Sequence, residues 1–176
     1  MRTGSALAAA TLAAATAGAL AQESYPAKPI RFVIPFPPGG INDAVTRNLN
    51  ARLPALLGQG TVIDYRPGAG GNLGAEHVAK SPADGYTILV ANNSITTNAS
   101  LYRKLPYDPF RDFAPVALGA TAPSMISVHP SLPAKSIREL VALAKTRPGV
   151  ITYGSAGTGT PTHLAGELFR VRTGAS

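Results

Sequence analysis

Short apolar runs alternate with helical spacings from residue 28 onward. Apolar stretches at residues 30–35, 61–64 and 86–90 predict three strands, separated by segments that contain Gly, Pro or Asp-Gly turn signals. Segments of helical periodicity lie between the strands. Because strand and helix alternate in close succession, the pattern predicts an α/β protein with a parallel sheet and right-handed crossover connections.

Two helices are expected between these strands. The first begins at Ile41 or Asn42, and its spacing of four, four and three places on one face Val45, Leu49, Leu53 and Leu56. Pro54 predicts a kink or a break in this helix. A shorter helix is predicted at residues 72–80, whereas the polar residues 92–100 are expected to be irregular, or helical at their end.

The second half of the chain contains the most clearly delimited helix. Ser136 and Glu139 have the spacing of a capping box, an apolar face follows, and Arg147-Pro148-Gly149 ends the helical pattern. This helix belongs to the part of the chain after residue 120.

The order of strand, glycine-rich loop and helix then recurs near the C-terminus. Residues 150–153 predict a strand, and residues 154–160 form a second glycine-rich loop. Thr160 is expected to cap a helix that has Pro161 at its first position.

Residues 1–21 have the pattern of a secretory signal peptide. Arg2 follows the free amine, residues 5–20 are mostly Ala, Leu, Thr and Gly, and Ala19-Leu20-Ala21 fits a cleavage site before Gln22. A membrane anchor is the alternative, but the stretch is short and alanine contributes little to membrane insertion. We expect an exported, periplasmic protein without a lipid anchor, since no cysteine stands at the cleavage point.

Composition and charge exclude several classes of protein. The 176 residues include no Cys, which excludes a disulfide-stapled or zinc-thiolate protein. The net charge of +7 comes from scattered basic residues that are not interleaved with aromatics, so no nucleic-acid partner is expected. A basic surface can instead raise the encounter rate with anionic ligands. The three histidines lack the spacing of metal ligands, and no metal site is predicted.

Two glycine-rich loops, residues 66–71 and 154–160, each join a predicted strand to a predicted helix. Backbone N–H groups and the positive end of the following helix can together bind an anion without Lys or Arg. The alternative is that the glycines only make tight turns. Two similar loops favour a shared site for a small carboxylate.

Catalytic and nucleotide-binding alternatives fit less well. Gly68-x-Gly70-x-x-x-Gly74 is similar to a dinucleotide fingerprint, but no acidic residue ends the next strand. Gly154-Ser155-x-Gly157 is an incomplete nucleophile elbow, and nothing places a histidine against Ser155. We therefore expect no catalysis and no cofactor, and a nucleotide-binding enzyme stays as the less favoured alternative.

Six motifs follow one another along the mature chain. They are Tyr25-Pro26-x-Lys28-Pro29-Ile30-Arg31, Pro35-Phe36-x-Pro38-Gly39-Gly40-x-x-Asp43, Arg66-Pro67-Gly68-Ala69-Gly70-Gly71-Asn72-x-Gly74-Ala75, Pro82-x-Asp84-Gly85-Tyr86-Thr87, Leu105-Pro106-Tyr107-Asp108-Pro109 with Asp112-Phe113-x-Pro115-Val116, and Tyr153-Gly154-Ser155-x-Gly157-x-Gly159-Thr160-x-x-His163-Leu164-Ala165-Gly166-Glu167. Together they resemble the solute receptors of tripartite tricarboxylate transporters, the Bug-type periplasmic binding proteins.

The resemblance implies a type II periplasmic-binding-protein fold, a Venus flytrap of two parallel-sheet α/β domains that clamp a ligand. For this chain it implies a first domain at residues 22–120 and the start of a second, with a hinge strand, at residues 121–176. The implied function is a monomeric receptor that delivers a small carboxylate to a membrane permease.

The resemblance also implies the ligand-binding residues. A first loop, at residues 36–43, contributes Phe36, Pro38, Gly39, Gly40 and Asp43, partly through ordered waters. The second loop, which is the glycine-rich loop that begins at residue 154, contacts a ligand carboxylate together with the start of the next helix, through Ser155, Gly157, Thr158, Gly159, Thr160 and His163. Because Asp43 cannot pair with a carboxylate directly, we expect it to cap backbone N–H groups or to hold a bridging water.

Three features depart from the family pattern. Ile41 replaces a small or polar residue, which implies a more apolar mouth of the first loop. Tyr65 replaces a common Asn and is interpreted as a surface variation. Family members continue well beyond residue 176, so the second domain is expected to be incomplete here, and a non-functional gene fragment is the alternative to a working receptor.

Overall fold

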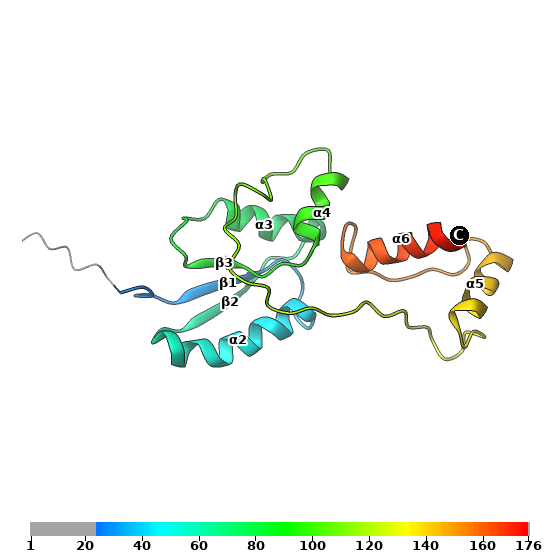
Figure 1. Ribbon diagram of the computed structural model, residues 1–176, viewed down its shortest axis with the longest axis horizontal. Coiled ribbons are helices and arrows are strands. Elements are labelled where there is room, and N and C mark those ends of the chain that lie inside the picture. Colours follow the sequence, from blue (N-terminus) through cyan, green and yellow to red (C-terminus); the bar gives the residue numbers. More distant parts are fainter. Residues whose placement is uncertain (1–23, 176) are drawn as a thin grey trace, which may run out of the picture.

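The computed structural model describes residues 24–175, so the predicted signal peptide at residues 1–21 lies outside the described residues. Three parallel strands form a sheet in the order β2-β1-β3: β1 is Ile30–Ile34, β2 is Thr61–Tyr65 and β3 is Thr87–Leu89. Helix α2 (Ile41–Leu57) covers one face of the sheet, and α3 (Asn72–Ala79) and α4 (Ser94–Leu101) lie on the other (Figure 1). The predicted parallel α/β arrangement is confirmed.

The core is built around the central strand β1. Phe32 pairs in register with Ile63 of β2 and with Ile88 of β3. Phe32, Val33 and Ile34 are each at most 4% exposed, and burial of a side chain of this size contributes about 1.5–3 kcal/mol. Both faces of β1 are therefore covered, as is usual for a central parallel strand, and its C-terminal end gives a rigid base to the loop that follows.

Helix α2 differs from its prediction in two ways. Pro54 lies inside a single helix, so the predicted break does not occur and the alternative, a kink, stays a prediction; the helix ends where Gly58 adopts a left-handed conformation. The predicted apolar face is only partly buried, because Leu56 is 79% exposed. Polar residues pack against the sheet instead, where Asn42 Nδ2 donates to the carbonyl of Val90 at 2.9 Å and Thr46 is fully buried.

A long segment without helix or strand, residues 113–129, leads from the sheet region to α5 (Ile137–Thr146) (Figure 1). The predicted cap of α5 is confirmed, since the Ser136 hydroxyl accepts from Glu139 N–H at 3.2 Å. The Glu139 carboxylate reaches back to Lys135 N–H at 2.6 Å, one residue earlier than in a standard capping box.

Helix α6 (Pro161–Thr173) begins at Pro161 and has Thr160 as its N-cap, as predicted. The strand predicted at residues 150–153 is wrong, and no strand is found between residues 121 and 175, where the resemblance implied a hinge strand. A strand needs a neighbour for its N–H and C=O groups. Tyr153 instead lies against Gly166 of α6 and donates to Glu167 at 3.0 Å.

Two parts of the described chain are thus distinct in Figure 1, the sheet with α2 to α4 and the pair of helices α5 and α6. The domain boundary near residue 120 stays a prediction. Among residues 24–175, no helix is both long and apolar enough to cross a membrane.

Candidate ligand-binding site

Asp43 lies in the first turn of α2, behind the loop of residues 35–40. Its Oδ2 accepts a hydrogen bond from Gly39 N–H at 2.8 Å, and its Oδ1 accepts one from the Tyr65 hydroxyl at 2.6 Å. Arg47, one turn further along α2, approaches Oδ1 at 2.9 Å. Asp43 therefore caps a backbone N–H group of the first loop, which is one of the two roles expected from the sequence. Its place among the ligand-binding residues stays a prediction.

The interpretation of Tyr65 as a surface variation is wrong. Tyr65 is half-buried at the end of β2 and accepts a hydrogen bond from Arg47 at 3.0 Å while it donates to Asp43. The hydrogen bonds from Tyr65, Gly39 and Arg47 lower the pKa of Asp43 below its ordinary value of 3.8. The bond to Asp43 raises the pKa of Tyr65. A charged carboxylate and a neutral phenol therefore hold the first loop to β2 at neutral pH.

The other predicted residues of the first loop are spread along its exposed side. Pro38, Gly39 and Gly40 are exposed, with Gly40 as the N-cap residue of α2. Phe36 is partly buried, and its ring lies 3.2 Å from the position that a Cβ on Gly71 would occupy. Phe36 thus turns towards the glycine-rich loop at residues 66–71.

At least two glycines of the dinucleotide-like pattern at residues 68–74 have a structural reason. Gly70 has a φ of 64°, which favours glycine. A Cβ on Gly74, in the first turn of α3, would come within 2.7 Å of Pro35 Cβ. The fingerprint-like spacing therefore serves the close approach of α3 to the end of β1.

The second glycine-rich loop is closed by hydrogen bonds to one of its own side chains and to two side chains in the first turn of α6. Ala156 N–H donates to the Thr162 hydroxyl at 3.2 Å, and Gly157 N–H donates to the Ser155 hydroxyl at 3.3 Å. Gly159 N–H donates to Nδ1 of His163 at 3.4 Å. These bonds are long, and a carboxylate makes shorter and stronger bonds with N–H groups than a neutral acceptor does. An incoming carboxylate can therefore take over these three donors.

The side chains of this loop divide into committed and available donors. Thr160 is 1% exposed, and its hydroxyl donates to the carbonyl of Gly157 at 2.6 Å. Ser155 and Thr158 are exposed, and within residues 24–175 their hydroxyl protons have no assigned acceptor. Because Nδ1 of His163 accepts from Gly159, the neutral imidazole carries its proton on Nε2, where it can donate.

The structure brings the second loop against the sheet part of the molecule. A Cβ on Gly70 would collide with the carbonyl oxygen of Thr158. Thr97 of α4 donates to the carbonyl of Gly159 at 3.3 Å. Since residues 66–71 also contact Phe36, they lie between the two sets of residues that the sequence assigned to one site.

A buried polar cluster beside this junction, formed by Asn72, Asn98 and Tyr107, was not predicted from the sequence. Oδ1 of Asn72 accepts from Asn98 Nδ2 at 2.7 Å and from the Tyr107 hydroxyl at 2.9 Å. Burial raises the pKa of Tyr107, so its phenol stays a neutral donor. The available signal was Ser94 and Asn98, polar residues four apart that both proved buried in α4.

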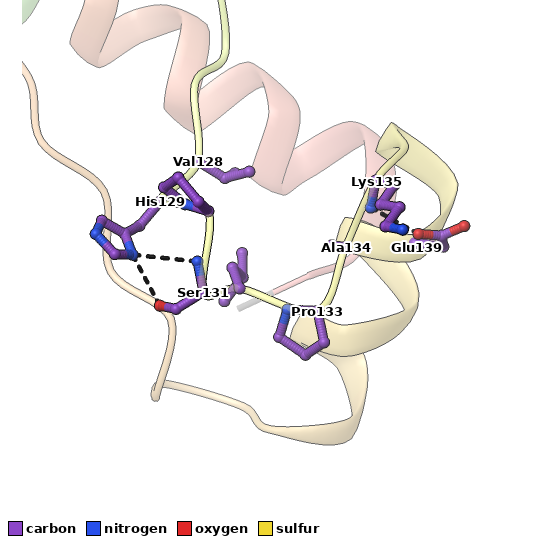
Figure 2. Close-up of a pocket in the computed structure, with 9 residues that line it drawn as sticks. Val128, His129, Ser131, Pro133, Ala134, Lys135 and Glu139 are labelled. Carbon is purple, nitrogen blue, oxygen red and sulfur yellow. Dashed lines mark hydrogen bonds between the residues drawn. The ribbon is translucent and has the colours of Figure 1, made fainter.

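A pocket of about 470 Å³ lies beside α5 and is shown in Figure 2. It is lined by residues 128–135 and by Glu139, and none of residues 154–160 contributes to it. Its walls are largely exposed, and Nδ1 of His129 lies 2.8 Å from the hydroxyl of its neighbour Ser131. In the described part of the chain, no three His, Asp or Glu side chains are grouped to hold a metal ion.

Residues 45–176 match the family model of the tripartite tricarboxylate transporter family receptor. Protein BugT of Bordetella pertussis is 40% identical over 167 residues, which are 92% of this chain and 51% of BugT. Among solved structures, R. palustris Rpa4515 with adipate is 41% identical with a TM-score of 0.83, over 86% of this chain and 51% of that one.

Two further structures are similar. Periplasmic binding protein BugD is 31% identical with a TM-score of 0.74, and 86% of this chain covers 51% of it. MatC (Rpa3494) from Rhodopseudomonas palustris with bound malate is 27% identical with a TM-score of 0.72, and 86% of this chain covers 52% of it.

The chain spans about half the length of the relatives that it matches. The likeness to a periplasmic binding protein confirms the predicted fold class, and the family model covers most of the sequence. The chain therefore belongs to the tripartite tricarboxylate transporter receptor family.

Proposed function

We propose that the protein is a periplasmic receptor that captures a small carboxylate and delivers it to a tripartite tricarboxylate-type membrane transporter. The observation that carries the proposal is the loop at residues 154–160, where three N–H groups are held by long bonds to neutral acceptors. The family match and the similarity to proteins with adipate and with malate support it.

In this proposal the second loop binds the ligand carboxylate. The N–H groups of Gly157 and Gly159, the hydroxyls of Ser155 and Thr158, and Nε2 of His163 are its donors. The two N–H groups exchange their present acceptors, the Ser155 hydroxyl and Nδ1 of His163, for the anion when it arrives. Thr160 contributes by holding the loop in shape, because its own hydroxyl is committed to Gly157.

The first loop faces the rest of the ligand. Phe36 and Pro38 supply apolar contact, and Gly39 and Gly40 allow the ligand to approach the backbone. Asp43 keeps this loop in place through Gly39, and Ile41, which is 53% exposed, makes the mouth of the loop apolar. The ligand is accordingly a carboxylate with a short carbon chain.

The remaining parts of the proposal follow from the family rather than from the site. Residues 1–21 are removed on export, and the mature receptor acts as a monomer without catalysis. The part with the sheet and the part with α5 and α6, divided near residue 120, close over the ligand and present the closed form to the permease.

A thermal-shift panel tests the proposal and its main alternative together. Adipate, malate and other small dicarboxylates are compared with ATP and NAD at equal concentration. A ligand at 100 times its Kd stabilises a protein by about 2.7 kcal/mol, which is a readily measured shift. We expect dicarboxylates to raise the melting temperature and nucleotides to leave it unchanged.

The same panel separates the alternatives. Stabilisation by a nucleotide alone would favour the enzyme hypothesis. A cooperative melting transition that no compound moves would favour a non-functional product. Replacement of both Ser155 and Thr158 by Ala should reduce the shift by dicarboxylates, because it removes the two available hydroxyl donors of the loop.

A further inference from the structure

Asn98 of α4 lies where the two glycine-rich loops meet. It is 1% exposed, and its Nδ2 donates to the carbonyl of Gly70 at 3.3 Å and to Asn72 at 2.7 Å. Both bonds fix the amide to the loop at residues 66–71 and to the start of α3. The orientation of the Asn98 side chain is therefore set by the sheet part of the molecule.

The other side of the same amide faces the second loop. A Cβ on Gly159 would overlap Oδ1 of Asn98, so the Gly159 backbone lies directly against that oxygen. Within residues 24–175 this oxygen is buried and has no hydrogen-bond donor. Buried acceptors without a donor are rare in folded proteins, and this acceptor is held against the loop by two bonds on its nitrogen.

Thr97, the preceding residue, makes a direct bond across the same junction. Its hydroxyl donates to the carbonyl of Gly159 at 3.3 Å, and the carbonyls of Asn93 at 3.1 Å and Ser94 at 3.5 Å compete for the same proton. Thr96 is a natural comparison, because its hydroxyl donates at 3.0 Å to the same Asn93 carbonyl and it is exposed. The two threonines thus differ in their contact with the second loop.

We propose that Thr97 and Asn98 of α4 are positioning residues that hold the loop at residues 154–160 in a fixed position against the loop at residues 66–71. This inference rests on the proposed function for its effect on binding, since both residues would act on the carboxylate only through Gly159. Neither residue contacts the ligand. Asn98 provides a surface shaped for a glycine backbone, and Thr97 ties that backbone to α4.

The first test measures adipate binding by isothermal titration calorimetry on the full chain. Thr97→Val removes the hydroxyl at nearly constant shape, Thr97→Ser restores it, and Thr96→Val is the matched control. Loss of one neutral hydrogen bond corresponds to about a two- to tenfold change in affinity. We expect that loss for Thr97→Val, with near-normal affinity for Thr97→Ser and Thr96→Val.

A second measurement needs no ligand. Because the chain has no cysteine, spin labels can be placed at Arg52→Cys on α2 and Ala142→Cys on α5, and their distance measured by double electron–electron resonance. We expect Asn98→Ala and Thr97→Val to broaden the distribution of distances, while Thr96→Val leaves it unchanged. If Asn98→Ala does not fold, the three threonine variants decide the outcome.

The two measurements distinguish the failure of each hypothesis. If the parent chain binds neither adipate nor malate but Thr97→Val broadens the distances, the carboxylate function is wrong and the positioning role stands. If Thr97→Val changes neither the affinity nor the distances relative to Thr96→Val, the positioning role is wrong. An equal loss of affinity in Thr97→Val and Thr96→Val would also overturn the positioning role, because the loss would then come from a general disturbance of α4 and not from the contact of Thr97 with Gly159.

Discussion

Replacement of Thr160 by Ala separates the stability of helix α6 from the function of the loop before it. The Thr160 hydroxyl accepts from His163 N–H at 3.5 Å and donates to the carbonyl of Gly157 at 2.6 Å. The first bond caps α6, and the second closes the loop that is proposed to hold the carboxylate. Alanine removes both bonds.

The expected loss of stability can be worked from these two contacts. Removal of a Thr N-cap costs about 0.5–2 kcal/mol. Because the capping bond here is long, we expect its contribution to stability to lie at the low end of this range. The carbonyl of Gly157 keeps a second donor, Thr160 N–H at 3.2 Å, so it does not become an unsatisfied acceptor. We therefore expect a total destabilisation of about 1–1.5 kcal/mol.

Ser136→Ala is the matched control, because Ser136 caps α5 through Glu139 N–H at 3.2 Å and lies outside the proposed site. Both variants should unfold at slightly lower urea concentration than the parent chain. Only Thr160→Ala should also lose affinity for a dicarboxylate, and Thr160→Ser should recover it. Urea unfolding followed by circular dichroism and calorimetric titration supply the two readouts.

The role of Thr160 in binding is refuted if Thr160→Ala and Ser136→Ala lose stability equally and both bind the dicarboxylate like the parent. Thr160 would then be only a helix cap. A destabilisation of Thr160→Ala above about 3 kcal/mol would also disagree, since it would exceed the range for a lost cap and require a collapse of the loop.

Two further predictions concern the first loop and its support. The lowered pKa of Asp43 means that its carboxylate stabilises the fold fully above pH 3.8 and less as the pH falls through its folded-state pKa. The melting temperature of the parent, measured by scanning calorimetry, should therefore fall more steeply between pH 4 and pH 2 than that of Asp43→Asn. Parallel curves for the two proteins would argue against this role. Gly74→Ala should destabilise the protein by about 1–3 kcal/mol in urea unfolding, because its Cβ would meet Pro35 at 2.7 Å. Gly60→Ala is the control and should change urea unfolding little, since no atom lies within 4 Å of the new Cβ. Equal effects of the two substitutions would contradict the close packing of Gly74 against Pro35.

Much of the fold follows from local sequence patterns. The parallel sheet, the cap at Ser136 and the Pro161 start of α6 were predictable because each depends on a short pattern with one dominant physical cause. The strand at residues 150–153 was not, because a strand exists only where a neighbour completes its hydrogen bonds. Its apolar residues give the same signal whether or not that neighbour is present.

In the site, too, features set by local sequence could be predicted, whereas features set by distant residues could not. The cap that Asp43 provides could be predicted from its position after Gly39 and Gly40, since a carboxylate is stabilised in the first turn of a helix. Its pairing with Tyr65, 22 residues later, depends on the register of β1 with β2. The amide of Asn98 could not be assigned either, because its partners come from the 66–71 loop, α3 and the second glycine-rich loop.

The proposed function depends on recognition of a carboxylate charge by the backbone and hydroxyl donors of the second loop. Calorimetric titration of the full chain with adipate and malate, each beside an uncharged diol of similar length, tests it most directly. We expect at least one dicarboxylate to bind and its diol to give no heat of binding. Equal binding of a diol and its dicarboxylate, or no binding of any dicarboxylate by a cooperatively folded chain, would contradict it.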